Sequence, residues 1–264
     1  MNVLLIGHGA IAEEVLKRLG PEEPARVTGV LVRDRRIAEA RAALPDTIEV
    51  VGALDDLRVP PDIAAECAGH SGVAEFGEDV LRRGIDLIVI SIGALADRGL
   101  YERLSAAATE GGAKLLLPAG AVAGADALAA ARVGGLTDVV YVSRKPPRAW
   151  KGTPAEDIVD LDGLREEAVL YEGSADEAAR LYPQNANVAA TIALAGAGFD
   201  GTKVRLVADP AAGGNIHHVH AEGAFGAFDI EVRGKPLPDN PKTSSLAAYS
   251  VVAALRRRAG AIEI

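Results

Sequence analysis

The chain opens with Met1-Asn2-Val3-Leu4-Leu5-Ile6-Gly7-His8-Gly9-Ala10-Ile11-Ala12, and this stretch decides the fold of its first half. The apolar run at residues 3–6 is typical of a buried parallel strand. The pattern G-x-G-x-x-A follows directly and leads into an amphipathic segment that ends before Pro21. Strand, glycine turn and helix in this order predict a dinucleotide-binding βαβ unit.

Each residue of the glycine pattern has a physical reason to be there. Gly7 lets the strand turn sharply, and Gly9 has no side chain, so a pyrophosphate can approach the backbone. Ala10 and Ile11 open the helix, whose free N–H groups and positive dipole end attract phosphate. Ala12 is small enough for the helix to pack close to the strand. We predict that Gly7, Gly9, Ala10 and Ile11 bind the cofactor. The motif alone leaves an ordinary tight turn open.

A second apolar run at residues 27–32 ends at Arg33-Asp34-Arg35-Arg36. Asp34 stands at the distance from the glycines where a carboxylate binds the adenosine ribose hydroxyls of NAD. The flanking arginines instead favour the 2′-phosphate of NADP. We predict Asp34 as a cofactor-binding residue and NAD as the cofactor, with NADP as the alternative. The arginines are equally typical of a solvated helix start.

Strands alternate with helices up to about residue 118, and several strands with fewer helices follow. This order predicts an α/β protein that has a Rossmann-type doubly wound parallel sheet. It also predicts a second α+β domain with a mixed or antiparallel sheet. We expect the nucleotide domain at 1–122 and the domain for substrate, catalysis and oligomerisation at 123–239. A final helix at 240–264, capped by Thr243 or Ser244, is expected to pack back on the first domain, by analogy with two-domain oxidoreductases.

Composition excludes several classes of protein. The 264 residues are 49% apolar and carry a net charge of −9, which argues against broad binding to nucleic acids or anionic membranes. One cysteine excludes a disulfide framework and a thiolate zinc cluster. The N-terminus has no signal-peptide pattern, and the longest apolar stretch is too short to cross a bilayer. We expect a cytoplasmic protein.

Three of the five histidines lie in His217-His218-Val219-His220. In an extended strand the side chains alternate between faces, so His217 and Val219 share one face and His218 and His220 share the other. His218 and His220 suggest the start of a metal site, but no third ligand is identifiable, and we predict no metal. A structural histidine with satisfied hydrogen bonds is the alternative for each of them.

Four ordered motifs resemble the NAD(P)-dependent L-aspartate dehydrogenase family. They are Gly7-His8-Gly9-Ala10-Ile11-Ala12, Gln184-Asn185-Ala186-Asn187-Val188-Ala189-Ala190-Thr191, Gly214-Asn215-Ile216-His217 and Asn240-Pro241-Lys242-Thr243-Ser244. The resemblance implies oxidation of L-aspartate to iminoaspartate, which hydrolyses to oxaloacetate and ammonia and also feeds NAD biosynthesis. It implies that His217 is the catalytic residue, that Ala121 and Asn187 bind NAD, and that the protein is a homodimer.

The chemistry of the residues fits that resemblance. An imidazole with a pKa near neutrality can serve the proton transfers of amine oxidation and of water attack on the imine. The two substrate carboxylates need local cations. Arg144 and Lys145 at a strand end are candidates, as are Lys242, Thr243 and Ser244 before the last helix. Ordinary strand-end charge and helix capping explain these residues equally well.

Two other functions remain open at this point. One is a related reductase or dehydrogenase for another carboxylated metabolite, such as aspartate semialdehyde, homoserine or dihydrodipicolinate, because the nucleotide domain does not encode the substrate. The other is a regulator that senses NAD(H) without chemistry. The acidic chain shows no DNA-reading element, which counts against the regulator.

Overall fold

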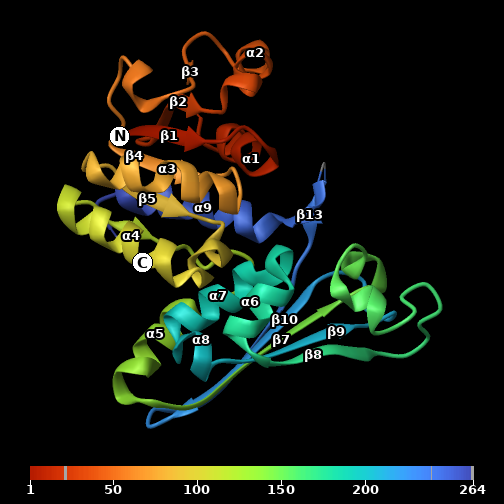
Figure 1. The fold of residues 1–264 in the computed structure, drawn as a ribbon. Coiled ribbons are helices and arrows are strands. Elements are labelled where there is room, and N and C mark those ends of the chain that lie inside the picture. The colour runs from red at the N-terminus through yellow and green to blue at the C-terminus, as the bar shows by residue number, and fades with distance from the viewer. Residues whose placement is uncertain (21–22, 239, 263–264) are drawn as a thin grey trace. The chain divides into compact units, whose positions relative to one another are not determined.

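A six-stranded parallel sheet forms the centre of the first unit, in the order β3-β2-β1-β4-β5-β6 (Figure 1). The computed structural model describes residues 1–20, 23–238 and 240–262, and the side chains of Gln184, Pro241 and Lys242 lie outside that description. The first unit comprises Met1–Pro118 and Ala247–Ile264, and the second comprises Ala119–Leu246. The strands of the first unit are β1 (Asn2–Ile6), β2 (Arg26–Leu31), β3 (Glu49–Val51), β4 (Ile63–Glu66), β5 (Asp86–Val89) and β6 (Leu115–Leu116).

Helices cover both faces of this sheet, as the sequence predicts for a doubly wound fold. Their bounds are α1 (Ala10–Arg18), α2 (Asp34–Ala43), α3 (His70–Arg82), α4 (Arg98–Gly111) and α9 (Ser245–Ala259). Val3 and Leu5 of β1 share a core with Val15 of α1 and Val251 of α9. A side chain at Gly77 would clash with Leu104, so α3 and α4 pack closely together. Because Val251 of α9 belongs to the core around β1, the final helix returns to the nucleotide-binding sheet.

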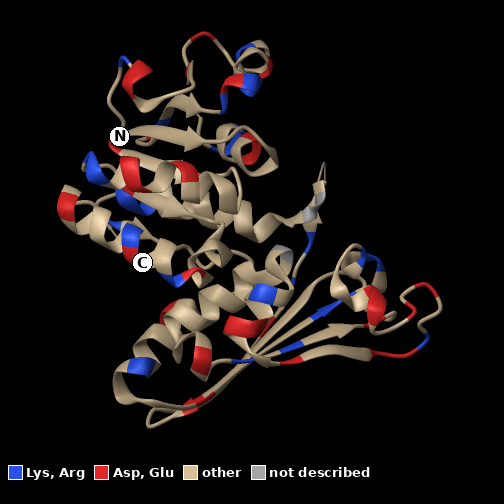
Figure 2. Ribbon diagram, in the orientation of Figure 1, with Lys and Arg blue, Asp and Glu red and all other residues tan. Residues whose placement is uncertain are grey.

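Apart from Glu66 and Asp86, the described charged side chains of the first unit are not buried. Figure 2 shows β1 without any charged residue, whereas α3 and α4 carry acidic and basic side chains along their length. Glu78 of α3 pairs with Arg103 of α4 at 2.8 Å. None of the described helices is both long and apolar enough to cross a membrane.

The second unit contains a mixed five-stranded sheet in the order β11-β10-β7-β9-β8. Strands β7 and β9 are parallel, and the other neighbours are antiparallel. The strands are β7 (Leu136–Lys145), β8 (Ala168–Ser174), β9 (Lys203–Ala208), β10 (Ile216–Gly223) and β11 (Gly226–Arg233). A smaller sheet pairs β12 (Pro236–Leu237) with β13 (Asn240–Ser244). The helices are α5 (Ala125–Gly134), α6 (Ala175–Leu181), α7 (Ala186–Ala195) and α8 (Gly198–Gly201).

The expected helix from residue 240 is wrong at its start. Residues Asn240–Ser244 form a strand, and α9 begins only at Ser245. Asn240 precedes a proline and is therefore restricted to extended conformations, while the β-branched Thr243 fits a strand. The hydroxyl of Ser244 is buried and forms no hydrogen bond within the described part of the chain, so it does not cap the helix.

Candidate functional site

The glycine turn after β1 opens onto a pocket of about 490 Å³. Gly7 and Gly9 line it, together with Cys67 and Ala68 after β4. Gly7 has φ +94°, the left-handed region that favours glycine. A side chain built at Gly9 meets nothing within 4 Å, so the space beside its backbone is open. Ala10 and Ile11 form the first turn of α1, whose N–H groups attract phosphate. These residues fit the pyrophosphate of a dinucleotide.

Arginines at the start of α2, just after β2, line the same pocket. Arg33 pairs with Glu75 at 2.7 Å and Arg36 pairs with Glu39 at 2.8 Å, whereas Arg35 has no ion pair among the residues described. Asp34, the predicted ribose ligand, is the first residue of α2, and its carboxylate lies directly against Gly52. The three arginines line the pocket together with the glycines, and Asp34 does not.

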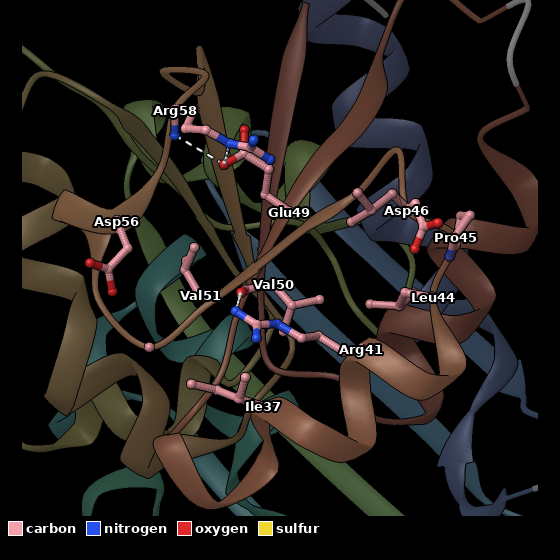
Figure 3. A pocket seen from close by; sticks show the side chains of 12 residues that line it. Ile37, Arg41, Leu44, Pro45, Asp46, Glu49, Val50, Val51, Asp56 and Arg58 are labelled. Atoms are coloured by element: carbon pink, nitrogen blue, oxygen red, sulfur yellow. Dashed lines mark hydrogen bonds and ion pairs between the residues drawn. The ribbon is translucent and has the colours of Figure 1, made fainter.

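A second pocket, of about 450 Å³, lies between α2 and the edge strand β3 (Figure 3). Both arginines that line this pocket already bond to other groups of the protein. Arg41 donates to the carbonyl oxygen of Val50 at 3.3 Å, and Arg58 pairs with Glu49 at 3.3 Å. The glycines of the turn do not line it. We therefore assign the nucleotide to the pocket that Gly7 and Gly9 line.

Sequence reasoning missed Glu66, a fully buried carboxylate at the end of β4. Its Oε1 accepts hydrogen bonds from the backbone N–H groups of Ala68 and Gly69, both at 2.7 Å, and its Oε2 accepts one from Ser91 at 3.0 Å. Burial raises the pKa of this carboxyl group. Glu66 thus ties together the loops after β4 and β5 at the edge where the glycine turn lies. The sequence feature that could have identified Glu66 is an acidic residue at the end of an otherwise apolar strand.

In the second unit, His217 of β10 lies opposite Ser143 of β7 and is 4% exposed. Its Nδ1 is 2.8 Å from the hydroxyl oxygen of Tyr141. Burial, and secondarily the charge of Lys145, lower the pKa of His217 to about 3. The imidazole is therefore neutral at physiological pH.

The predicted alternation of the histidines is confirmed. Val219 is buried on the same face as His217, and His218 and His220 are half-buried on the other face. One nitrogen of each of these two lies 3.1 Å from Oδ1 of Asp229. Within the described residues, no group of three or more His, Cys, Asp or Glu side chains is arranged to hold a metal ion.

The structure separates Arg144 from Lys145. Alternation along β7 puts Lys145 on the face of Tyr141 and His217, and Arg144 on the opposite face. Arg144 pairs there with Glu167, and with Asp209 at 3.3 Å. Lys145 instead donates from Nζ to Oδ1 of Asn185 at 2.5 Å, just before α7. The neighbouring residues 144 and 145 therefore cannot serve one substrate group together.

The remaining predicted residues occupy three places in the second unit. Ala121 packs against its core, and Asn187 is exposed in the first turn of α7, where its carbonyl oxygen accepts from Thr191 at 2.9 Å. Thr243 and Ser244 lie in β13. The side chain of Lys242 is outside the described residues. The roles of these residues stay predictions.

Comparisons with known proteins find relatives of both units. Residues 126–258 match the family described as "Aspartate dehydrogenase, C-terminal", and residues 7–118 match "Homoserine dehydrogenase, NAD binding domain". The chain is 51% identical to the L-aspartate dehydrogenase of Cupriavidus necator and 49% identical to that of Pseudomonas aeruginosa, with 100% of each chain covered. The crystal structure of aspartate dehydrogenase from Thermotoga maritima has a TM-score of 0.76 and 30% identity, and covers 100% of this chain and 99% of its own.

Proposed function

Because the chain belongs to the L-aspartate dehydrogenase family, we propose that it oxidises L-aspartate with NAD or NADP as the hydride acceptor. The product is iminoaspartate, which water converts to oxaloacetate and ammonia. The observation that carries this proposal is the match of residues 126–258, because that region contains Tyr141, Lys145 and His217 on one face of a sheet. The homoserine dehydrogenase description applies only to the nucleotide-binding half, which does not encode the substrate.

The reaction needs a substrate amine that has lost its positive charge. A hydride leaves Cα only when the nitrogen lone pair can form the C=N bond, so a group of the protein has to take one proton from the ammonium. When bound, the oxidised nicotinamide accepts the hydride. The backbone at Gly7 and Gly9 and the start of α1 hold the pyrophosphate. His217 is the imidazole that contacts the reacting part of the substrate.

L-Aspartate carries two carboxylates, so its pocket needs a cation near the imidazole. Lys145 is the basic side chain on the face of His217, where it can bind a carboxylate or exchange a proton with the substrate ammonium. Arg144 is turned to the other face and is already paired with two carboxylates. This arrangement favours Lys145 over Arg144 as a residue of the substrate site.

The family resemblance also supports a homodimer as the working form of this protein. Light scattering coupled to size-exclusion chromatography tests this proposal directly. A mass of two chains supports it, and a mass of one chain at working concentration contradicts it.

The decisive experiment is an assay of NADH and NADPH formation by the purified chain. L-Aspartate should support reduction of NAD or NADP, and L-homoserine at the same concentration should not. Turnover of homoserine in place of aspartate would point to the related dehydrogenases. Binding of NADH without turnover of any amino acid would point to a nucleotide sensor.

A further inference from the structure

Lys145 is a basic side chain on the sheet face that carries His217. It is the last residue of β7 and shares a sheet face with Tyr141 and Ser143. His217 of β10 lies opposite Ser143, two residues before Lys145. Lys145 and His217 therefore reach out from adjacent strands on the same side of the sheet.

The surroundings of Lys145 fix its position without fixing its charge. Its Nζ donates to Oδ1 of Asn185 at 2.5 Å and lies 5.1 Å from the centre of the Trp150 ring. In the described parts of the chain, no carboxylate pairs with it, unlike Arg144 on the other face. Lys145 is half-buried, and an ammonium partly removed from water without a counter-charge loses its proton more easily. Burial accordingly lowers the pKa of Lys145 to about 8.

Lys145 and His217 form a pair of bases in which one positive charge disfavours another. The charge of Lys145 contributes to the lowered pKa of His217, which is about 3. An imidazole with so low a pKa does not retain a proton taken from an ammonium group at neutral pH. A lysine with a pKa near 8 does, because a base works best when its pKa is close to the operating pH.

We propose that Nζ of Lys145 is the base that takes the proton from the α-ammonium group of L-aspartate, while His217 stays neutral beside it. The proposal rests on the proposed function. One N–H bond of the substrate breaks and one forms at Nζ. The freed lone pair becomes the C=N bond as the hydride leaves Cα for the oxidised nicotinamide. The resulting ammonium of Lys145 then releases this proton to solvent, which resets the base, and water converts the iminium to oxaloacetate and ammonium without it.

The rival role for Lys145 is that of a permanent cation for a substrate carboxylate, and Lys145→Arg separates the two roles. Arginine keeps the charge but does not deprotonate in a protein. If Lys145 is the base, Lys145→Arg lowers kcat by at least about a hundredfold, a typical loss on removing a general base, with a much smaller change in KM. Fluorescence titration with NADPH should give an unchanged Kd. Lys203→Arg, at an exposed lysine of the same sheet, is the matched control.

The pH dependence and chemical rescue give readouts that a structural role would not move. In the wild type, kcat/KM should rise with pH as Lys145 loses its proton, and this limb should be absent in Lys145→Arg. Lys145→Ala should regain part of its turnover when ethylamine supplies a base. Near-normal kcat and an unchanged pH profile in Lys145→Arg would overturn the proposal and leave the carboxylate role. A wild type that fails to oxidise aspartate would overturn the proposed function itself.

Discussion

The hydroxyl of Tyr141 lies 2.8 Å from Nδ1 of His217, and the two rings stack at an interplanar angle of 19°. Both side chains are buried. Burial raises the pKa of the Tyr141 hydroxyl well above its ordinary value, so the phenol keeps its proton. Nδ1 is committed to this contact, and proton or hydrogen-bond exchange with a substrate therefore falls to Nε2 of His217.

Removing the Tyr141 hydroxyl should affect turnover more than folding. Tyr141→Phe keeps the ring packing but frees the imidazole to turn, so kcat should fall about tenfold, as when partners that orient a reactive histidine are lost. The unfolding free energy should fall by about 1 kcal/mol for one hydrogen bond. Tyr182→Phe is the control, because its hydroxyl donates to Leu170 in the same core at 3.3 Å. Equal kcat values for the two variants would contradict the positioning role.

The predicted role of His217 can be tested against its neighbour. His217→Ala should leave cofactor binding nearly intact and cut turnover by at least about a hundredfold, because the reacting groups lose their imidazole. His218→Ala changes the next residue, which lies on the other face of β10, and should keep its turnover. The measurements are steady-state kinetics and NADH titration of both variants. Near-normal turnover in His217→Ala would show that His217 is not the catalytic residue.

Local sequence patterns predicted most of this architecture. The features that they missed depend on contacts between residues far apart in the sequence. The order of strand, glycine turn and helix at Gly7 gave the nucleotide-binding sheet, and alternation along residues 216–222 assigned His217 and His218 to opposite faces. The contact between Tyr141 and His217 joins residues 76 positions apart, and no local period encodes it. Alternation along β7 likewise separates Arg144 from Lys145, but which of the two shares a face with His217 depends on the pairing of β10 with β7.

Helix start and strand start proved harder to distinguish near residue 240. Thr243 and Ser244 are good capping residues, and the sequence after them has a clear apolar stripe. The strand pairing of β13 with β12 overrides that signal. Glu66 was missed because most of its partners are backbone N–H groups, which leave no side-chain pattern, and its one side-chain partner, Ser91, lies 25 residues away.

The two glycines of the turn should fail in different ways when changed to alanine. A side chain at Gly9 meets nothing within 4 Å, so Gly9→Ala should fold normally but block the approach of a pyrophosphate. Its Kd for NADH should rise at least about tenfold, or 1.4 kcal/mol. Gly7→Ala combines a positive φ with a Cβ only 2.7 Å from that of Ala68, and should lower the melting temperature. Unchanged NADH affinity in Gly9→Ala would place the cofactor elsewhere.

Arg35 should decide how well the protein distinguishes NADP from NAD. It lines the nucleotide pocket and, among the described residues, has no carboxylate partner, whereas Arg33 and Arg36 are each paired with a glutamate. A guanidinium in this position can bind the 2′-phosphate that only NADP carries.

Arg35→Ser should therefore raise the Kd for NADPH by about tenfold, the effect of losing one charge-assisted hydrogen bond, and leave the Kd for NADH almost unchanged. Fluorescence titration with both reduced cofactors measures this difference without any turnover. Arg58→Ser removes an exposed arginine that does not line this pocket and serves as the control. An equal loss of affinity for NADH and NADPH in Arg35→Ser would show that Arg35 contacts a part that the two cofactors share, and the ratio of the two affinities would then have to come from Arg33 or Arg36.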